Sequence, residues 1–598
     1  MPKTPDARQA GRLALRPLIL LGIVLVLTTL VYSRGVGGGW LFDDFPNIVD
    51  NPALELHDLT LADLTRAALS SPSSRFKRPL ASLSFAFNEY FSGRPDPQAM
   101  KLTNIVIHLL NGVVLYCLVL ALLGALGSRG PPLLGRDPHW TALLVTAAWL
   151  LLPINLTGVL YVVQRMTSLA NLFVLLGLLG YVHYRRRMQA GRHGLIGAAA
   201  SLVVATGIGF TAKETAVMAP LYALLIEWLV FGFSRGFSWS LGRHEQTRRI
   251  QVRILVLFFV VLALPLAAGL WWEIPQVFNP ATWTTRDFTL HQRLLSEAHA
   301  VADYVRWTLL PTPDALSFYH DAYPVSTGWL QPVQTLVGGV FLLAMAIVGV
   351  AVRKRAPLVA LGIGLFLAPQ LLTGTILPLE LVYEHRNYFA SFGLLLAVVP
   401  LLSAPGVAAL SRRVLLAALL LWWVGLTAFT AVAWNSPLSL ARTLAERAPQ
   451  SPRAQYGLGR EYIILSRYDP ASPYTKLAYA PLERAMRLPG SSILPEQALI
   501  MMNSNMHLPL KATWWDAIDK SLRAHKPGVQ DVTSMAALTD CAVKGNCKLP
   551  QDRMVQAFLA GLSHPGPSAR LLAAYANYAW NVMRDNALGL RMAKATVE

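Results

Sequence analysis

Two adjacent carboxylates, Asp43 and Asp44, follow the first long apolar run of the chain and lie in a polar stretch at residues 34–102. Neighbouring carboxylates repel each other, so one of them is expected to have a raised pKa and to accept a proton from a hydroxyl group near neutral pH. Their hard oxygen atoms also suit a divalent cation. The pair predicts acid chemistry at a membrane surface, and the alternative is a helix cap or a solvated turn.

A second set of polar residues begins in the same stretch and continues into the next apolar run. Asn104, His108 and Asn111 are spaced by four and three residues, so they lie on one face of a helix. A polar stripe on a membrane helix faces a cavity more often than lipid. Hydrogen bonding between helices is the alternative for the stripe. The set begins earlier, with Lys77 and Arg78, and contact with lipid headgroups is the alternative for these two cations.

Two further cations interrupt apolar sequence at expected turns. Arg165 and Lys213 could each hold a lipid phosphate, because charge-assisted hydrogen bonds to phosphate are strong. Lys213 could instead pair with its neighbour Glu214. The residue types leave both alternatives open.

Polar residues gather once more just before the tenth apolar run. Arg386 offers a pair of parallel donors that match a phosphate diester, and Glu384 and His385 are placed to orient it or to contact sugar hydroxyls. The long loop before the eighth apolar run adds Tyr319 and His320, in a mixture of aromatic and polar residues that suits a sugar or a membrane interface. A solvated turn is the alternative for the first group.

The composition shows which elements must position these residues. Of 598 residues, 54% are hydrophobic and 14% are charged, and the mean hydropathy is +0.43. These values exclude a soluble globular protein with an ordinary surface. Spans of about twenty residues predict an all-α polytopic membrane protein with about eleven transmembrane helices, near residues 17–33, 103–125, 140–157, 167–184, 194–211, 215–233, 253–271, 332–351, 357–376, 388–403 and 414–434.

The distribution of arginine and lysine predicts the orientation of these helices. The basic clusters fall on one side of the predicted membrane, which is therefore cytoplasmic. The loops 34–102, 271–331 and 377–387 and the tail then lie on the opposite side. The net charge of +19 is explained by the cytoplasmic loops and anionic lipid headgroups, and no nucleic-acid module is recognisable.

The tail differs in composition from the rest of the chain, which predicts a membrane domain at 1–434 and a soluble α-helical domain at 435–598. Residues 451–459 and 481–486 show the pattern of one degenerate tetratricopeptide-like helical pair, whereas an array needs about three repeats. Cys541 and Cys547 flank a short polar loop in this tail, where an oxidising compartment would permit a disulfide. Cys117 stands alone in an apolar helix and is expected to be buried.

Together, the ordered motifs resemble the GT-C superfamily of membrane glycosyltransferases, which use polyprenyl-phosphate sugars. The resemblance is greatest to the branch of protein O-mannosyltransferases that carry transmembrane helices followed by tetratricopeptide repeats. It covers about residues 15 to 490 and rests on Phe42-Asp43-Asp44 with Asn51-Pro52, Arg78-Pro79-Leu80 with Asn88 and Gly93, the run from Leu102 to Asn111, Lys213-Glu214, Leu316-Ser317 before Tyr323, and the run from Glu384 to Tyr388 followed by Gly393.

The resemblance implies an inverting transfer of a sugar from a polyprenyl phosphate to an exported acceptor. Asp43 would be the base and Asp44 the adjacent acid, with a divalent cation at this pair as the one cofactor to test. Arg386, Lys213 and Arg165 would bind the donor phosphate. The remaining substrate contacts would come from Arg78, Asn104, His108, Glu214, Tyr319, His320, Glu384, His385 and Tyr388.

The chain also departs from the pattern of that branch. The repeat array is almost absent, and Gln164-Arg165-Met166 replaces an expected Gly-Arg-Ala. A lipid or a surface polysaccharide is therefore the alternative acceptor, and a flippase for lipid-linked sugars or a membrane scaffold is the alternative from another functional class. Short loops and a composition rich in Ala, Leu and Arg favour a bacterial inner membrane with a periplasmic active site.

Overall fold

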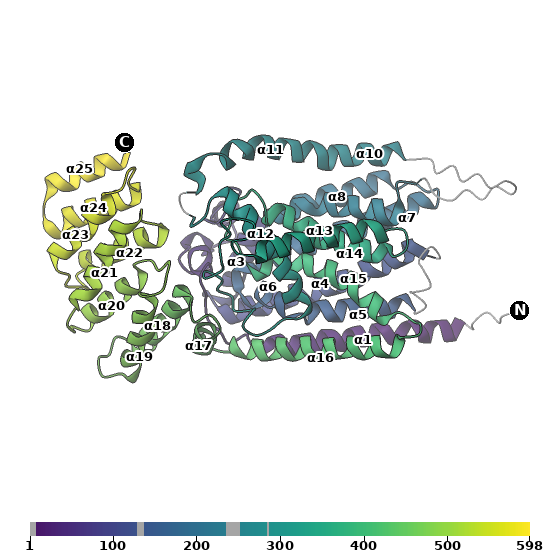
Figure 1. The fold of residues 1–598 in the computed structure, drawn as a ribbon, viewed down its shortest axis with the longest axis horizontal. Coiled ribbons are helices and arrows are strands. Elements are labelled where there is room, and N and C mark those ends of the chain that lie inside the picture. Colours follow the sequence, from purple (N-terminus) through teal and green to yellow (C-terminus); the bar gives the residue numbers. More distant parts are fainter. Residues whose placement is uncertain (1–6, 128–136, 235–250, 284–285, 598) are drawn as a thin grey trace, which may run out of the picture. The chain divides into compact units, whose positions relative to one another are not determined.

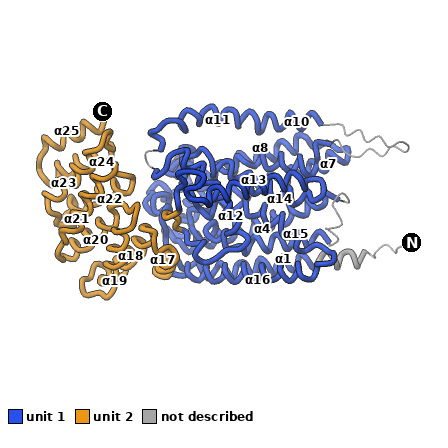
Figure 2. Tube along the Cα trace, in the orientation of Figure 1, with its two compact units in different colours: residues 1–318, 324–436 blue, residues 319–323, 437–598 orange. Residues whose placement is uncertain are grey.

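The computed structural model describes residues 7–127, 137–234, 251–283 and 286–597. Within these ranges the regular secondary structure is helical, apart from one isolated bridge between Gly328 and Gln331. The chain divides into two compact units, and the second contains residues 319–323 and 437–598 (Figure 2). The predicted all-α class is confirmed.

The first unit is built from long α-helices joined by short 3-10 and π helices (Figure 1). In chain order its elements are α1 (Ala7–Ser33), η1 (Phe45–Val49), η2 (Pro52–Leu54), α2 (Leu61–Ala68), α3 (Pro79–Ser92), α4 (Pro97–Leu126), α5 (Pro138–Leu150), η5 (Pro153–Asn155), α6 (Thr157–Leu160), η6 (Val162–Gln164), α7 (Arg165–Gln189), α8 (Leu195–Phe210), η7 (Glu214–Met218), α9 (Ala219–Ile226), η8 (Glu227–Phe231), α10 (Val252–Phe258), η9 (Phe259–Ala263), α11 (Leu264–Val277), η10 (Pro280–Trp283), α12 (Leu290–Leu309), α13 (Gln334–Val352), α14 (Pro357–Thr373), η11 (Glu384–Arg386), α15 (Asn387–Ser403) and α16 (Ala409–Ala433).

Eight helical stretches in the described ranges are long and apolar enough to cross a membrane. They begin at Arg16, Pro97, Val162, Glu214, Val252, Gln334, Glu384 and Ala409. The bent pair formed by α5 and the segment 153–160 makes nine if it counts as one span, and α8 and α14 are shorter apolar helices. Each of the eleven predicted helices overlaps one of these elements, so the protein is a multi-pass membrane protein.

Proline fixes the beginning of several helices near the polar loops. Pro79, Pro97 and Pro138 stand in the first turns of α3, α4 and α5, where a missing N–H costs no hydrogen bond. Asp96 and Asp137 cap α4 and α5 by accepting a backbone N–H. These signals place the polar loops beside the ends of the helices.

The helix predicted at 140–157 is broken. α5 ends at Leu150, and after Pro153 the chain continues through short helical turns at an angle of 55° until α7 begins at Arg165. Residues 151–168 are buried throughout. Irregular backbone is tolerated at membrane depth only where protein or water satisfies its polar groups. The break places the backbone of residues 161–164 next to the polar loop that contains Asp43.

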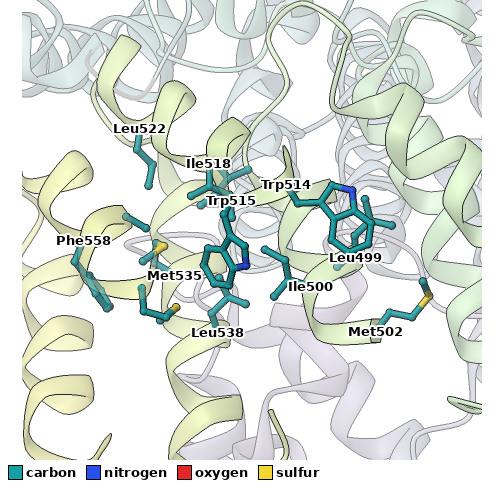
Figure 3. Packing of buried hydrophobic residues seen from close by; sticks show 14 of the residues in the cluster. Leu499, Ile500, Met502, Trp514, Trp515, Ile518, Leu522, Met535, Leu538 and Phe558 are labelled. Atoms are coloured by element: carbon teal, nitrogen blue, oxygen red, sulfur yellow. The ribbon is translucent and has the colours of Figure 1, made fainter. Parts of the chain in front are cut away.

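The second unit consists of α17 (Pro437–Arg447), α18 (Pro452–Ser466), α19 (Pro473–Ala485), α20 (Leu494–Asn505), α21 (Ala512–Ala524), α22 (Val529–Val543), α23 (Gln551–Leu562), α24 (Ala569–Tyr578), η12 (Ala579–Met583) and α25 (Asn586–Val597). Its core gathers apolar side chains spaced three or four residues apart, such as Trp514, Ile518 and Leu522 of α21 (Figure 3). The helical pair α18–α19 is present, with Leu482 packed against Gly459.

The three cysteines differ in environment. Cys541 and Cys547 are joined by a disulfide at the end of α22, with a Cα–Cα distance of 5.2 Å. Cys117 is exposed on the surface of α4, so the prediction that it is buried was wrong. The side chain of Cys117 points away from the partners of α4, because the polar stripe of that helix takes up the packed face.

Candidate active site

Asp44 is buried and bonded to backbone groups of two segments. Its carboxylate accepts the N–H of Leu41 at 2.9 Å and the N–H of Val163 at 2.8 Å. Burial raises the pKa of Asp44 to about 7, against the lowering effect of these two N–H donors and of Lys101. Asp44 therefore attaches the loop to the irregular segment before α7.

Asp43 is more exposed than Asp44 and is held through its backbone. Its N–H donates to Tyr161 Oη at 2.7 Å, and its carbonyl oxygen accepts from Asn47 Nδ2 at 2.9 Å. The preceding residue, Phe42, has φ 42°, a left-handed conformation that turns the chain at this point. The two aspartates thus have different environments, and the carboxylate of Asp43 is the more accessible one.

Lys213 binds side chains of residues that closely follow Val163. Its ammonium donates to Gln164 Oε1 at 3.1 Å and to Thr167 Oγ1 at 2.7 Å. Burial lowers the pKa of Lys213 to about 7, and the nearby cations Arg78 and Arg386 lower it further, whereas Asp43 opposes them. Lys213 is therefore within electrostatic range of Asp43 and of two arginines.

Arg78 pairs with Glu214, which resolves one of the alternatives left open by the sequence. Arg78 Nη2 lies 2.8 Å from Glu214 Oε2, and Arg78 Nε lies 3.1 and 3.2 Å from the two carboxylate oxygens. Ser74 Oγ also donates to Glu214. The carboxylate of Glu214 is thus bonded to Arg78 rather than to the adjacent Lys213.

Arg386 stands at the end of η11, directly before α15. Its guanidinium donates to the carbonyl of Leu381 at 3.0 Å and lies 5.2 Å from the ring centroid of Tyr383. The rings of His385 and Tyr383 stack with their centroids 5.0 Å apart. Glu384 is buried and accepts the N–H of Phe318 at 3.0 Å. Arg386 and Tyr383 are the half-buried members of this turn.

One short stretch, the 161–167 segment, connects the acidic and the basic groups. Tyr161 and Val163 hold the two aspartates, and Gln164 and Thr167 hold Lys213. Met166 Sδ accepts from Arg78 Nη1 at 3.2 Å. The contributions of Tyr161 and Val163 could not be predicted, because an aromatic and an apolar residue in an apolar run carry no signal of this role.

Arg165 lies in this segment, and its side chain contacts residues of α3 and α4. It is completely buried, and its guanidinium donates to Asn104 Oδ1 at 2.7 Å and to the carbonyls of Ser84 and Met100 at 2.8 and 2.9 Å. Its guanidinium also lies 4.7 Å from the ring centroid of Phe85. These protein acceptors take up the donors that were expected to bind a donor phosphate.

The polar stripe of α4 makes hydrogen bonds between helices. Asn104 donates to the carbonyls of Val159 and Val162, and Asn111 donates to the carbonyl of Ser168. His108 Nε2 lies 2.9 Å from the carbonyl of Leu150, and its Nδ1 lies 2.6 Å from Tyr388 Oη.

Since a carbonyl only accepts, Nε2 of His108 carries the proton and Nδ1 accepts the hydroxyl of Tyr388. All four polar residues, including Tyr388, are buried among helices. These contacts therefore favour the alternative reading of the stripe, in which its residues form hydrogen bonds between helices and do not line a cavity.

Two buried charges that the sequence analysis did not select border this site. Lys101 of α4 is fully buried beside the loop that contains Asp44. Glu297 of α12 is buried in an ion pair with Arg293 at 2.9 Å, and burial raises the pKa of Glu297 to about 7 while Arg293 and Arg386 lower it. For Lys101 the available signal was a charge at the beginning of an apolar run, whereas Glu297 lies among the other charged residues of α12 and offered no such signal.

Two sequence candidates belong to the second unit. Tyr319 and His320 are in the segment 319–323, which belongs to the second unit, where Asp321 accepts a hydrogen bond from Ser451. Among the described residues, no three His, Cys, Asp or Glu side chains are grouped so that they could hold a metal ion.

Comparison with known proteins gives partial matches. Over 167 residues, which is 27% of this chain, the sequence is 32% identical to Protein O-mannosyl-transferase TMTC4 of Mus musculus, and the match covers 22% of that protein. The human protein of the same name is 32% identical over 171 residues, with 23% of its length covered. The chain thus matches less than a quarter of the length of these relatives. No family model and no solved structure matches.

Proposed function

We propose that this chain is a membrane glycosyltransferase that moves a sugar from a polyprenyl phosphate to a hydroxyl group of an exported protein. The 161–167 segment carries the proposal, because it holds an accessible carboxylate, Asp43, and a half-buried cation, Lys213, within electrostatic range of each other. The partial similarity to protein O-mannosyl-transferases supports this class and makes mannose the first sugar to test.

In the proposed reaction the acceptor oxygen attacks the anomeric carbon on the face opposite the phosphate. Asp43 takes the proton of the acceptor hydroxyl as the new bond between carbon and oxygen forms. The bond between the anomeric carbon and the phosphate oxygen breaks, and the polyprenyl phosphate leaves with the electron pair. The configuration at the anomeric carbon is inverted, and no further reactant is needed.

Lys213 and Arg386 are the proposed partners of the leaving phosphate. Negative charge grows on the phosphate as the bond breaks, so fixed cations stabilise the transition state more than the bound donor. Arg78 is less suited to this role, because Glu214 already accepts its Nε and Nη2 hydrogen bonds. Asp44 and Arg165 are proposed to hold the local structure, since their partners are protein groups.

The orientation proposed for this reaction is the one that the basic clusters predict. The loop with Asp43 and the second unit would lie on the exported side, which is the periplasm if the chain is bacterial. Acceptor and donor would then meet outside the cytoplasm. The chemistry of transfer is the same for a protein, a lipid or a polysaccharide hydroxyl, and the assay below separates these acceptors.

The experiment is transfer of radiolabelled sugar from polyprenyl-phosphate mannose, and then from other polyprenyl-phosphate sugars, to exported proteins and to lipids. Purified parent protein is compared with Asp43→Asn and Asp44→Asn. Asp43→Asn is expected to lower turnover by about a hundred- to ten-thousand-fold, the usual contribution of a general base, with binding of the donor and the thermal midpoint unchanged.

Asp44→Asn is expected to act differently. The amide N–H₂ of the introduced asparagine would face a backbone N–H in place of a carboxylate oxygen, so the thermal midpoint of the whole protein falls. Turnover by Asp43→Asn at the parent rate would remove Asp43 as the base. Absence of transfer from every donor tested would reject the proposed function.

A further inference from the structure

The loop that contains Asp43 begins with a glycine stretch, residues 35–39, which packs against the end of α16. A β-carbon at Gly37 would collide with the carbonyl oxygen of Asn435, and one at Gly38 would collide with the carbonyl oxygen of Trp434. These two glycines are not in the left-handed region, since neither has a positive φ. Glycine is needed here because two backbones approach closely.

Lys101 also contacts the glycine stretch. Its ammonium donates to the carbonyl of Gly38 at 2.6 Å and lies 3.4 Å from the carbonyl of Gly35. It also lies 5.6 Å from the ring centroid of Trp434. The glycine stretch therefore contacts both a buried cation and the last residues of the first unit.

Burying the charged ammonium of Lys101 costs free energy unless neighbouring groups compensate for it. A fully buried ammonium loses its hydration, and only well-placed acceptors and opposite charges offset that loss. A methionine or leucine would fill the same space without this cost. Lys101 instead supplies hydrogen bonds to two backbone carbonyls of the glycine stretch and an electrostatic attraction to Asp44.

We propose that Lys101 is a positioning residue for the base: by fixing the glycine stretch against Trp434 and Asn435, it places the carboxylate of Asp43 for proton transfer. The inference rests on the proposed function. Lys101 contacts backbone carbonyls and is not proposed to touch the donor or the acceptor. A displacement of about 1 Å at a reacting group can cost about a hundredfold in rate, which sets the expected effect.

Two substitutions test this role in the full-length protein. Lys101→Met removes the hydrogen bonds and puts an apolar side chain in the same space, whereas Gly38→Ala keeps the lysine but adds a β-carbon that would meet both the carbonyl oxygen of Trp434 and the ammonium of Lys101. Lys354→Met at an exposed turn and Gly22→Ala, where a β-carbon meets nothing within 4 Å, are the matched controls. Asp43→Asn is measured in the same series.

The measurements are kcat for transfer from polyprenyl-phosphate mannose and the stoichiometry and Kd for undecaprenyl phosphate as a probe of the lipid-phosphate site. Lys101→Met and Gly38→Ala are each expected to lower kcat by about a hundredfold with the parent stoichiometry and Kd, and the two controls keep the parent kcat.

Parent kcat in Lys101→Met would overturn the proposal. A fall in binding stoichiometry that matches the fall in kcat would also overturn it, because the variant would then contain fewer folded sites rather than misplaced bases. If Asp43→Asn retains the parent kcat, Asp43 is not the base and the positioning role of Lys101 is overturned with it. If the parent protein transfers sugar from no donor, the proposed function itself fails. The two failures are therefore distinguishable.

Discussion

At the scale of single residues, the contacts separate charges that the sequence presents as equivalent. Asp43 and Asp44 are neighbours, but the carboxylate of Asp44 accepts two backbone N–H groups and is buried, whereas Asp43 is partly exposed and its backbone N–H donates to Tyr161. Lys213 and Arg165 are both cations at interruptions of apolar sequence, yet Arg165 is completely buried and bonded to Asn104. Charge is visible in a sequence, whereas the backbone partner of a charge is not.

The lowered pKa of Lys213 predicts how kcat/KM for the sugar donor depends on pH. Burial and neighbouring cations lower the pKa of Lys213 to about 7, so its positive charge is lost as the pH rises through that value. We expect kcat/KM for the donor to fall above about pH 7, approaching tenfold per pH unit as for a single titrating group. Lys213→Arg keeps its charge over this range and should flatten the profile.

The measurement is kcat/KM against pH from about 6 to about 9 for parent protein and Lys213→Arg. Lys354→Arg, at the exposed turn before α14, is the control and should reproduce the parent profile. The same alkaline fall in Lys213→Arg as in the parent would assign the titration to another group.

At the scale of elements, hydropathy predicted which stretches are helices, since each of the eleven expected spans overlaps a helix or the bent pair. The break after Leu150, inside the helix predicted at 140–157, was not predicted. Averaged hydropathy does not report the backbone path, and residues 151–164 are as apolar as a regular span. That break brings Val163 to Asp44 across a separation of 119 residues, so the most important contact of the site depends on it.

The helices of the second unit contain a buried acid, Glu496, whose pKa predicts how the stability of this unit depends on pH. Glu496 of α20 is buried near Asp531, and its Oε2 is among the buried atoms of the described residues without a hydrogen-bond partner. Burial raises the pKa of Glu496 to about 8, compared with 4.5 in an unfolded chain. Because the folded state binds the proton of Glu496 more tightly than the unfolded chain, the contribution of this group to the free energy of unfolding is greatest below about pH 4.5. That contribution is lost as the pH rises towards 8.

We therefore expect the second unit to become less stable between about pH 5 and about pH 8, by up to about 1.4 kcal/mol per pH unit from this group. Glu496→Gln should remove that dependence and stabilise the unit at the upper end of this range. Hydrogen exchange of α20 and α22 in the full-length protein measures it, with the exposed Glu446→Gln as a control. Equal slopes in parent and Glu496→Gln would contradict the assignment.

At the scale of the whole molecule, composition predicted the class, and the order of motifs predicted the resemblance that the partial matches to TMTC4 support. The division after Ser436 lies close to the change in composition that the sequence shows at 434. The placement of Tyr319 and His320 in the second unit was not predictable, because a five-residue segment carries too little pattern to be assigned to a domain.

At this scale we predict how the protein is oriented in the membrane. The positive-inside rule places the turn at Lys354 in the cytoplasm and the second unit outside. With Cys117 replaced by serine, a single cysteine introduced at Ser563 should react with a membrane-impermeant maleimide in intact cells, whereas one introduced at Lys354 should react only after permeabilisation. The native disulfide leaves Cys541 and Cys547 unreactive. The reverse labelling pattern would place the loop of Asp43 in the cytoplasm.

The close approach at Gly37 and Gly38 also has a consequence for how such a sequence can change over evolution. The atoms that exclude a side chain there are the carbonyl oxygens of Asn435 and Trp434, which every residue type possesses. No substitution at 434 or 435 can therefore compensate for a larger residue at 37 or 38. A descendant that lost catalysis but kept this fold would be free to lose Asp43 and would still retain these two glycines.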